Sequence, residues 1–305
     1  MKKGESSLTS LISAFARAYH SQFDHPKIFA DHVAEDLISQ KELAEITANL
    51  VQGVKFFNKG IAQKLKGDQD EMLKWITQIQ LSPITIARAA YCEKVVLHDV
   101  LLGLKQYVIL GAGLDTFCFR HPELSGTLEI FEIDYPATQE NKKTRLEKVH
   151  DQIPDHLHLV PMDFTKTFSY QSLLSNGFDL HKKTLFSLLG VSYYLTKEEN
   201  FRLIKSVMAQ VPSGSSIIID YADENLFSEK GTFNRVENMV KMAAASGEPM
   251  KSCFTYDEME KLLEEAGLLI YEHLTPTKMD DLYFRNRRDY LSAFETIHYI
   301  HAVVR

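Results

Sequence analysis

The stretch Val108-Ile109-Leu110-Gly111-Ala112-Gly113-Leu114-Asp115-Thr116 is a short apolar run that ends in a Gly-x-Gly turn. The apolar run predicts a buried strand, and the glycines let the backbone turn tightly and come close to a ligand. Asp134 follows Gly113 by 21 residues, at the end of a second apolar run. At that distance a carboxylate can bind both hydroxyls of a ribose. The two features predict a nucleoside site at the carboxyl ends of the first two strands.

The turn lacks the parts that bind a pyrophosphate. A dinucleotide fingerprint has a third glycine where Thr116 stands here, so that a helix N-terminus can reach the phosphates. The carboxylate of Asp115 would also repel an anion. The pattern therefore favours a nucleoside without phosphate, of which S-adenosylmethionine is the common example. Two alternatives stay open: a nicotinamide-dependent oxidoreductase, and a plain turn between a strand and a helix beside a solvated Asp134.

Apolar runs with strand character recur along the chain. They are Gln106–Leu110, Leu128–Ile133, His158–Pro161, Thr184–Leu189, Ser215–Asp220, Leu268–Leu274 and Ile297–Val304. Helical segments lie between most of them, and two begin with a capping box, at Thr196 to Glu199 and at Thr255 to Glu258. Strands that alternate with helices predict an α/β fold. We expect one seven-stranded, mostly parallel sheet with helices on both faces.

The first 98 residues show helical periodicity and no run that looks like a strand. Helices are expected over 8–19, 34–63, 72–80 and a last stretch that Ser82 caps ahead of Pro83. Residues 1–98 are therefore predicted to form a helical cap, and residues 99–305 the domain that holds the sheet. Helices are also expected within the connection 221–252. A connection of that length is usually a lid or a binding element, and a mere helical cover of the sheet is the alternative.

The composition is that of an ordinary globular protein, with 45% apolar and 25% charged residues, a net charge of −7 and a pI of about 6.0. A mildly acidic surface argues against nucleic acid as a partner, because phosphate binding needs a basic field. We expect no secretory signal and no membrane span. Cys92, Cys118 and Cys253 form no Cys-x-x-Cys pair, which indicates free thiols and no metal site. A soluble cytoplasmic protein is expected, of undetermined oligomeric state.

Two motifs together resemble the leucine carboxyl methyltransferase family. They are Leu110–Thr116 followed by Arg120, and Phe131-Glu132-Ile133-Asp134-Tyr135-Pro136. The family includes bacterial O-methyltransferases of the type found in polyketide biosynthesis, and further similarities extend over nearly the whole chain. The resemblance implies a class I Rossmann-like methyltransferase fold and S-adenosylmethionine as cofactor. It also implies methyl transfer to a carboxylate or hydroxyl, on a small molecule more readily than on a protein terminus.

The resemblance further implies which residues contact the cofactor. Arg17, in a helix similar to the family's N-terminal helix, and Arg88, in the segment Ala87-Arg88-Ala89, would lie at the cofactor carboxylate. Asp163 would accept from the adenine amino group, and the backbone of Phe164 would donate to the adenine. The remaining contacts would come from Gly111, Ala112, Gly113, Asp115 and Asp134. The alternatives are solvent for Arg17, a structural salt bridge for Arg88 and a helix cap for Asp163.

One position departs from the family pattern. Family members have an acid just before the Gly-Val pair of the fourth-strand motif, and Leu189 stands there in this chain. Its absence motivates a further alternative, a cofactor-binding protein of the same fold without catalysis. Tyr193, Tyr194 and Tyr221 lie near strand ends and could line an acceptor pocket, with packing as the alternative. The sequence names no general base, so no catalytic residue is assigned.

Overall fold

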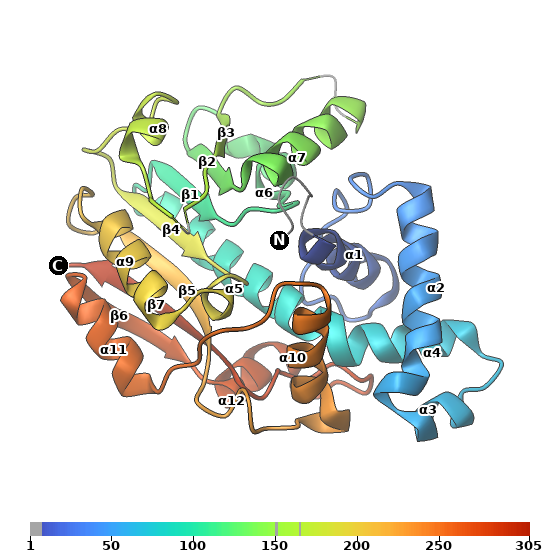
Figure 1. Ribbon diagram of the computed structural model, residues 1–305. Coiled ribbons are helices and arrows are strands. Elements are labelled where there is room, and N and C mark those ends of the chain that lie inside the picture. Colours follow the sequence, from blue (N-terminus) through green and yellow to red (C-terminus); the bar gives the residue numbers. More distant parts are fainter. Residues whose placement is uncertain (1–7, 150–151, 165) are drawn as a thin grey trace.

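A seven-stranded sheet forms the centre of the computed structural model, which describes residues 8–149, 152–164 and 166–305 (Figure 1). The strands are β1 (Gln106–Leu110), β2 (Glu129–Asp134), β3 (Leu157–Pro161), β4 (Thr184–Leu188), β5 (Ser216–Ala222), β6 (Leu268–Leu274) and β7 (Ile297–Val304). Their order across the sheet is β3-β2-β1-β4-β5-β7-β6. β1 to β5 run parallel, and β7 pairs antiparallel with β5 and β6. The predicted α/β fold is confirmed.

The central strands are buried on both faces, which explains their uninterrupted apolar sequences. Every residue of β1, β4 and β5 is buried. Because side chains alternate along a strand, neighbouring residues enter two different cores. Ile109 faces the layer that contains α5 (Ser82–Leu101). Leu110 faces the opposite layer, with α9 (Lys197–Met208) and α11 (Tyr256–Glu265).

The capping boxes predicted for α9 and α11 are both present. Thr196 accepts from the Glu199 N–H, and the Glu199 carboxylate accepts from the Thr196 N–H at 2.8 Å. The Thr255 and Glu258 pair has the same arrangement at the start of α11. The other helical segments of this part are α6 (Phe117–Arg120), η2 (Pro122–Leu124), α7 (Pro136–Val149), α8 (Tyr170–Leu174), η3 (Ser192–Tyr194), α12 (Pro276–Met279) and η5 (Asp280–Phe284).

The N-terminal part is helical, as predicted, and among residues 8–105 the structure has no strand. Its helices are α1 (Leu8–Phe23), α2 (Gln40–Phe57), α3 (Lys59–Lys64), α4 (Gln69–Ile76), the π-helical segment η1 (Thr77–Leu81) and α5. The boundary predicted at residue 98 falls inside α5, whose buried side chains belong to the core between this helix and the sheet. The helical part and the sheet therefore share a helix. Within the described ranges, no helix has the length and apolarity that crossing a membrane requires.

Ser82 is not a helix N-cap, so that prediction is wrong. The chain stays helical from α4 through η1 into α5, and Ser82 itself has helical dihedral angles, φ −66° and ψ −41°. Its side chain is buried. A serine followed by a proline is a good start signal, but the proline ring is also tolerated in the first turn after a π-helical segment.

The long connection after β5 contains the expected helices, η4 (Thr232–Asn234) and α10 (Arg235–Ala245). It packs against the N-terminal part, because the rings of Phe233 and Trp75 meet edge-on with centroids 5.5 Å apart. The buried Arg235 guanidinium lies over the Phe294 ring and pairs with Glu295 at 2.7 Å. The connection is therefore anchored at both of its sides, and α10 contacts η1.

Candidate active site

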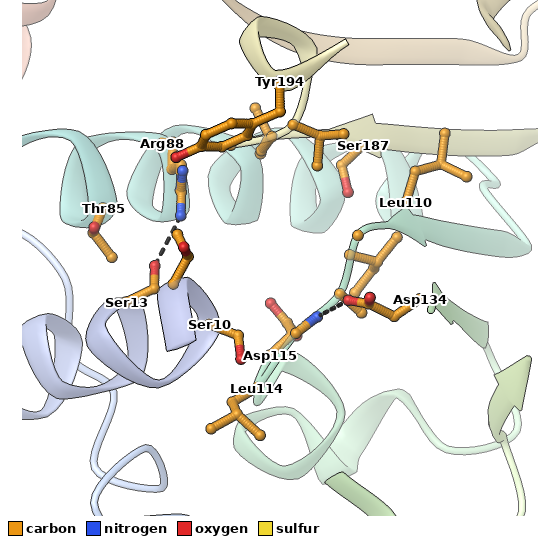
Figure 2. A pocket seen from close by; sticks show the side chains of 18 of the residues that line it. Ser10, Ser13, Thr85, Arg88, Leu110, Leu114, Asp115, Asp134, Ser187 and Tyr194 are labelled. Carbon is orange, nitrogen blue, oxygen red and sulfur yellow. Dashed lines mark hydrogen bonds between the residues drawn. The ribbon is translucent and has the colours of Figure 1, made fainter. Parts of the chain in front are cut away.

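A cavity of about 550 Å³ opens at the carboxyl ends of β1, β2 and β4 (Figure 2). Residues of α1 and α5 line one part of it, and the segment 247–251, which follows α10, lines another. The volume is within the range of about 300–1,000 Å³ that is usual for small-molecule sites. Open α/β sheets bind their ligands at this edge, and the sequence predicts the nucleoside site there.

Both glycines of the Gly-x-Gly turn have positive φ, +79° at Gly111 and +54° at Gly113. A Cβ on Gly111 would lie 2.5 Å from Cγ2 of Val191, and a Cβ on Gly113 would lie 2.8 Å from Cβ of Ser10. The turn therefore needs glycine for its backbone conformation. It also needs glycine because Val191, in the turn that follows β4, and Ser10 of α1 come so close. The Gly111 N–H donates to the Ile133 carbonyl at 2.8 Å, which fixes the turn to β2.

Asp134 lies at the end of β2 in the wall of the same cavity. Its Oδ2 accepts from the Gly113 N–H at 2.7 Å, and its Oδ1 accepts from the Tyr135 N–H at 2.6 Å. Burial raises the pKa of Asp134, although the two N–H groups oppose the rise. Each carboxylate oxygen keeps a further lone pair, so the group has room to accept from two hydroxyls. This geometry fits the predicted ribose contact.

A buried ion pair that no local sequence pattern indicates supports the turn. Lys142, in α7, donates to the Asp115 carbonyl at 2.7 Å and contacts the Glu132 carboxylate. Burial raises the pKa of Glu132 to about 7, and Lys142 opposes the rise. Oδ1 of Asp115 accepts from the Phe117 N–H at 2.8 Å, which begins α6. Asp115 and its neighbour Ala112 both line the cavity.

Arg17 lines the cavity, but it does not point freely toward a ligand as expected. Its Nε pairs with Asp31 at 2.7 Å, and its Nη2 donates to the Leu114 carbonyl at 2.6 Å. The fully buried Asp31 also accepts from Thr116 and lies 3.6 Å from Arg120. Burial would raise the pKa of Asp31, but Arg17 and Arg120 outweigh it and hold that pKa low. The guanidinium of Arg17 therefore connects α1 to the Gly-x-Gly turn.

Arg88 extends from α5 into the cavity, between the small side chains of Ala87 and Ala89. Its Nη2 donates to the Ser13 hydroxyl at 2.8 Å, and its Nη1 lies 3.9 Å from Oδ2 of Asp220. Figure 2 shows the Arg88 guanidinium beside Ser13 and, across the same pocket, Asp134 beside the turn. Arg88 thus has a structural partner and also faces the ligand space, and its contact with the cofactor carboxylate stays a prediction.

Asp163 and Phe164 follow β3 and line the cavity on the side of Asp134. The Asp163 carboxylate pairs with the exposed Lys166 ammonium at 2.9 Å. The Phe164 ring packs on the core of the α9 face, next to the Gly111 backbone. The predicted adenine contacts are therefore grouped at one end of the cavity, while Arg88 stands elsewhere in its wall.

The three tyrosines proposed for the acceptor pocket have different positions. Tyr194 and Leu189 line the cavity. Tyr193 is a correction: it is not part of the cavity wall, and its ring is buried in the core of the α5 face. Tyr221 is a second correction, since it faces the opposite core and contacts His273 at 3.2 Å. Proximity to a strand end does not determine which face a side chain enters.

The connection after β5 contributes residues to the site that the sequence did not indicate. Glu248 and Lys251 line the cavity, together with Glu199 of α9. The Thr9 hydroxyl of α1 donates to Glu248 at 2.7 Å, and Lys251 lies 3.9 Å from Glu199. The connection therefore forms part of the wall, which favours a lid or binding element over a mere cover of the sheet.

The described groups of the cavity that could remove a proton at neutral pH are carboxylates. No histidine belongs to its lining in the part of the chain that the structure describes. Burial raises the pKa of Cys92 and of Tyr194, both in the lining, to about 12. Both side chains are therefore protonated near neutrality and act as donors. Within the same described residues, no group of His, Cys, Asp and Glu is arranged to hold a metal ion.

Residues 10–208 match the model of the leucine carboxyl methyltransferase family. This chain belongs to that family. A family relative, the "Putative S-adenosyl-L-methionine-dependent methyltransferase YktD" of Bacillus subtilis (strain 168), is 66% identical over 99% of each chain. Family membership confirms the resemblance identified from the sequence. The chain is an S-adenosylmethionine-dependent methyltransferase, and S-adenosylmethionine is its cofactor.

Two solved structures share the fold. A DUF574 family protein from Streptomyces avermitilis MA-4680 is 13% identical, and each chain covers 99% of the other with a TM-score of 0.58. A putative methyltransferase from Thermobifida fusca YX is 12% identical, with a TM-score of 0.56 over 100% of this chain and 97% of that one. At these identities the likeness concerns the fold alone, which is the predicted one.

The residues of the cavity fit S-adenosylmethionine by their chemistry. A carboxylate at the end of β2 suits two ribose hydroxyls, and the ring of Phe164, the residue after Asp163, lies close to Gly111. The guanidinium of Arg88 suits an α-carboxylate. The turn presents no helix N-terminus of useful length for a pyrophosphate, because α6 has only 4 residues. Together with the family match, this sets the nicotinamide-dependent oxidoreductase aside.

Proposed function

We propose that this methyltransferase transfers the methyl group to an oxygen of a carboxylate on a small molecule. The observation that carries the proposal is the lack of a histidine base among the described residues of the cavity, where Cys92 and Tyr194 are protonated and Glu93, Glu199 and Glu248 already accept from other groups. A carboxylic acid is already ionised at neutral pH, so its oxygen needs no general base. An alcohol must lose a proton during the transfer, for which histidine is the usual agent.

One cation of the cavity lining, Lys251, supports an anionic acceptor. Arg17 and Arg120 share Asp31, which neutralises much of their charge. Lys251 lies farther out, with 46% of its side chain exposed and the Glu199 carboxylate no closer than 3.9 Å. A loosely paired ammonium at this place is free to approach a carboxylate. Lys251 is therefore the residue we expect beside the acceptor.

The walls of the cavity favour a small acceptor over a protein terminus. The connection after β5 and α1 come together where Thr9 donates to Glu248. α10 and its flanks are anchored to the N-terminal part through Phe233 and Trp75. A protein chain would need an open groove on this side, whereas a small acid needs only the cavity itself.

The residues of this chain contribute mainly binding and alignment. Asp134 would accept from the ribose hydroxyls, Arg88 would bind the carboxylate, and Asp163 with Phe164 would hold the adenine. When bound, S-adenosylmethionine supplies a methyl group on a positively charged sulfur. Walls that fix the acceptor oxygen in line with that group lower the barrier by proximity, by about 7–11 kcal/mol at best.

Two alternatives remain for the acceptor and the activity. A hydroxyl acceptor would need a carboxylate base, and Glu93, Glu199 and Glu248 are acidic candidates in the lining. Glu93 pairs with Arg120. Glu199, however, accepts from the Thr196 N–H, and Glu248 accepts from Thr9. A cofactor-binding protein without catalysis is the second alternative, motivated by Leu189, which leaves an apolar side chain in the cavity wall.

The experiment is a transfer assay with S-adenosylmethionine labelled in the methyl group and matched panels of carboxylic acids, phenols and alcohols. A methyl ester releases labelled methanol in mild base, whereas a methyl ether does not. We expect labelled product from the acids, and release of the label by base. Label that appears only on phenols or alcohols and resists base would contradict the carboxylate acceptor. Cofactor binding without any product across all panels would favour the alternative without catalysis.

A matched pair of lysine variants tests the acceptor contact. Lys251→Met removes the cavity ammonium and should raise KM for the acid about tenfold, the effect of one charge-assisted contact, with little change in cofactor affinity. Lys261→Met removes an ammonium on α11 that is 77% exposed and should change neither value. Equal kinetics of the two variants would contradict the role of Lys251.

A further inference from the structure

Asp220, in β5, is a fully buried carboxylate just behind the cavity wall. Its Oδ1 accepts from the Gly190 N–H at 2.7 Å, in the turn that follows β4. Its Oδ2 has no hydrogen-bond donor among the described residues, and Nη1 of Arg88 lies 3.9 Å away. A buried carboxylate is costly unless a charge or a donor compensates it. Arg88 is the cation that faces it.

Gly190 brings Arg88 and Asp220 together. It has a φ of +74°, and a Cβ at this position would lie 2.2 Å from Nη1 of Arg88. The guanidinium therefore rests directly on the Gly190 backbone, whose N–H donates to Asp220. On its other side the guanidinium donates to Ser13 of α1. Arg88 is thus held between two walls of the cavity, and one of them depends on Asp220.

The other titratable groups that the structure describes around the pair carry no charge near neutrality. Tyr193 and Tyr194 approach from the β4 turn, and Tyr299 approaches from β7. Burial raises the pKa of each of these hydroxyls well above its usual value. Burial also raises the pKa of Asp220 to about 6, and Arg88 opposes the rise. At neutral pH the cluster therefore consists of one anion and one cation among neutral hydroxyls.

We propose that Asp220 is a positioning residue for cofactor binding: it fixes the Arg88 guanidinium and the Gly190 turn where the amino-acid end of the cofactor binds. This proposal rests on the assignment of Arg88 to the cofactor carboxylate. Leu189, next to Gly190, leaves the turn without an acid of its own. Asp220 supplies an acid to the same turn from the neighbouring strand, outside the cavity and in contact with its wall.

A pair of ligands separates positioning from a general effect on the fold. S-adenosylhomocysteine carries the amino-acid end, whereas 5′-methylthioadenosine has the same adenosine and thioether without it. Asp220→Asn keeps the shape and the acceptor for Gly190 but removes the charge. Calorimetric titration should show S-adenosylhomocysteine binding weakened about tenfold, as for one charge-assisted contact, with methylthioadenosine affinity changed less than twofold. Asp223→Asn is the matched control: it makes the same substitution at an aspartate that pairs with His298, and it should change neither affinity.

Each other result of the titration has a defined meaning. If Asp220→Asn weakens both ligands equally, or neither of them, the positioning role of Asp220 is wrong. Arg88→Met tests the underlying assignment separately, because it should weaken S-adenosylhomocysteine and not methylthioadenosine. If Arg88→Met discriminates between the ligands and Asp220→Asn does not, Arg88 keeps its assignment and the inference falls. If Arg88→Met does not discriminate, the assignment of Arg88 falls and the inference with it.

A measurement on the unaltered protein covers the case in which Asp220→Asn does not fold. S-adenosylhomocysteine affinity of the wild-type chain should fall as the pH is lowered through about 6, where Asp220 takes up a proton. Methylthioadenosine affinity, measured over the same range, should fall less. Parallel curves for the two ligands would overturn the inference, because Asp220 would then act on the cavity as a whole.

Discussion

The backbone N–H of Gly113 donates to Oδ2 of Asp134 at 2.7 Å, across 21 residues of sequence. The glycine turn and the acid at the end of β2 are therefore one unit, and each holds the other in place. Because α1 also packs on Gly113 through Ser10, the N-terminal part reaches the same unit. A change at any of these places should affect both stability and ligand binding.

Gly113→Ala should destabilise the protein and weaken cofactor binding. The new Cβ would lie 2.8 Å from Ser10 Cβ, at a φ of +54°. Overpacking costs typically about 1–3 kcal/mol, and the clash would displace α1 from the turn. Gly126→Ala is the matched control, since Gly126 has a φ of +75° with no heavy atom within 4 Å. Thermal unfolding and S-adenosylhomocysteine titration of both variants check this. Equal losses of stability and affinity in the two variants would show that the positive φ alone causes them and that the clash with Ser10 does not contribute.

Lys142→Met should lower the free energy of unfolding by about 1–3 kcal/mol, because it leaves the buried Glu132 carboxyl and the Asp115 carbonyl without their donor. The double variant Glu132→Gln with Lys142→Met should recover part of the loss. Lys143→Met, the next residue in α7, removes an ammonium that is 52% exposed and should cost less than about 0.5 kcal/mol. Urea unfolding measures all three, and a loss for Lys142→Met no larger than for Lys143→Met would contradict the role of the pair.

Cofactor binding should release a proton near pH 6. Burial places the pKa of Asp220 at about 6, above its ordinary value of 3.8, so below that pH the carboxyl is neutral and attracts Arg88 less. We expect the bound state to prefer the ionised carboxylate, so that the pKa of Asp220 is lower in the complex. Cofactor affinity then rises with pH and levels off near neutrality. Titrations in buffers of different ionisation enthalpy measure the proton. Proton uptake on binding would contradict this linkage. An affinity that does not depend on pH, in the wild-type chain as in Asp220→Asn, would contradict it as well.

Much of the fold was predictable because its signals are local. Each strand is an apolar run of five to eight residues, and a run of that kind between turn residues indicates a buried strand wherever it stands. The capping boxes at Thr196 and Thr255 are read within four residues. The turn Gly111–Gly113 and Asp134 were predictable for the same reason, since each is defined by its own few neighbours.

The partners of the site residues were not predictable, because they are distant in sequence. Lys142 lies in a mainly polar helix and has the pattern of a surface residue, yet it is fully buried against Glu132. Asp31 determines the position of Arg17 from a segment without helix or strand. Tyr221 was misplaced because a single residue at a strand end does not reveal which face it occupies. Such features depend on tertiary packing, which no local pattern encodes.

The most direct test of the central claim is calorimetric titration of the wild-type chain and of Asp134→Ala with S-adenosylhomocysteine. The claim is that the cofactor binds in the cavity between the Gly-x-Gly turn and the end of β2. We expect one site in the wild-type chain and a loss of at least about tenfold in Asp134→Ala, because the ribose hydroxyls lose a charged acceptor. Equal affinity of the two proteins, or no binding to the folded wild-type chain, would contradict it.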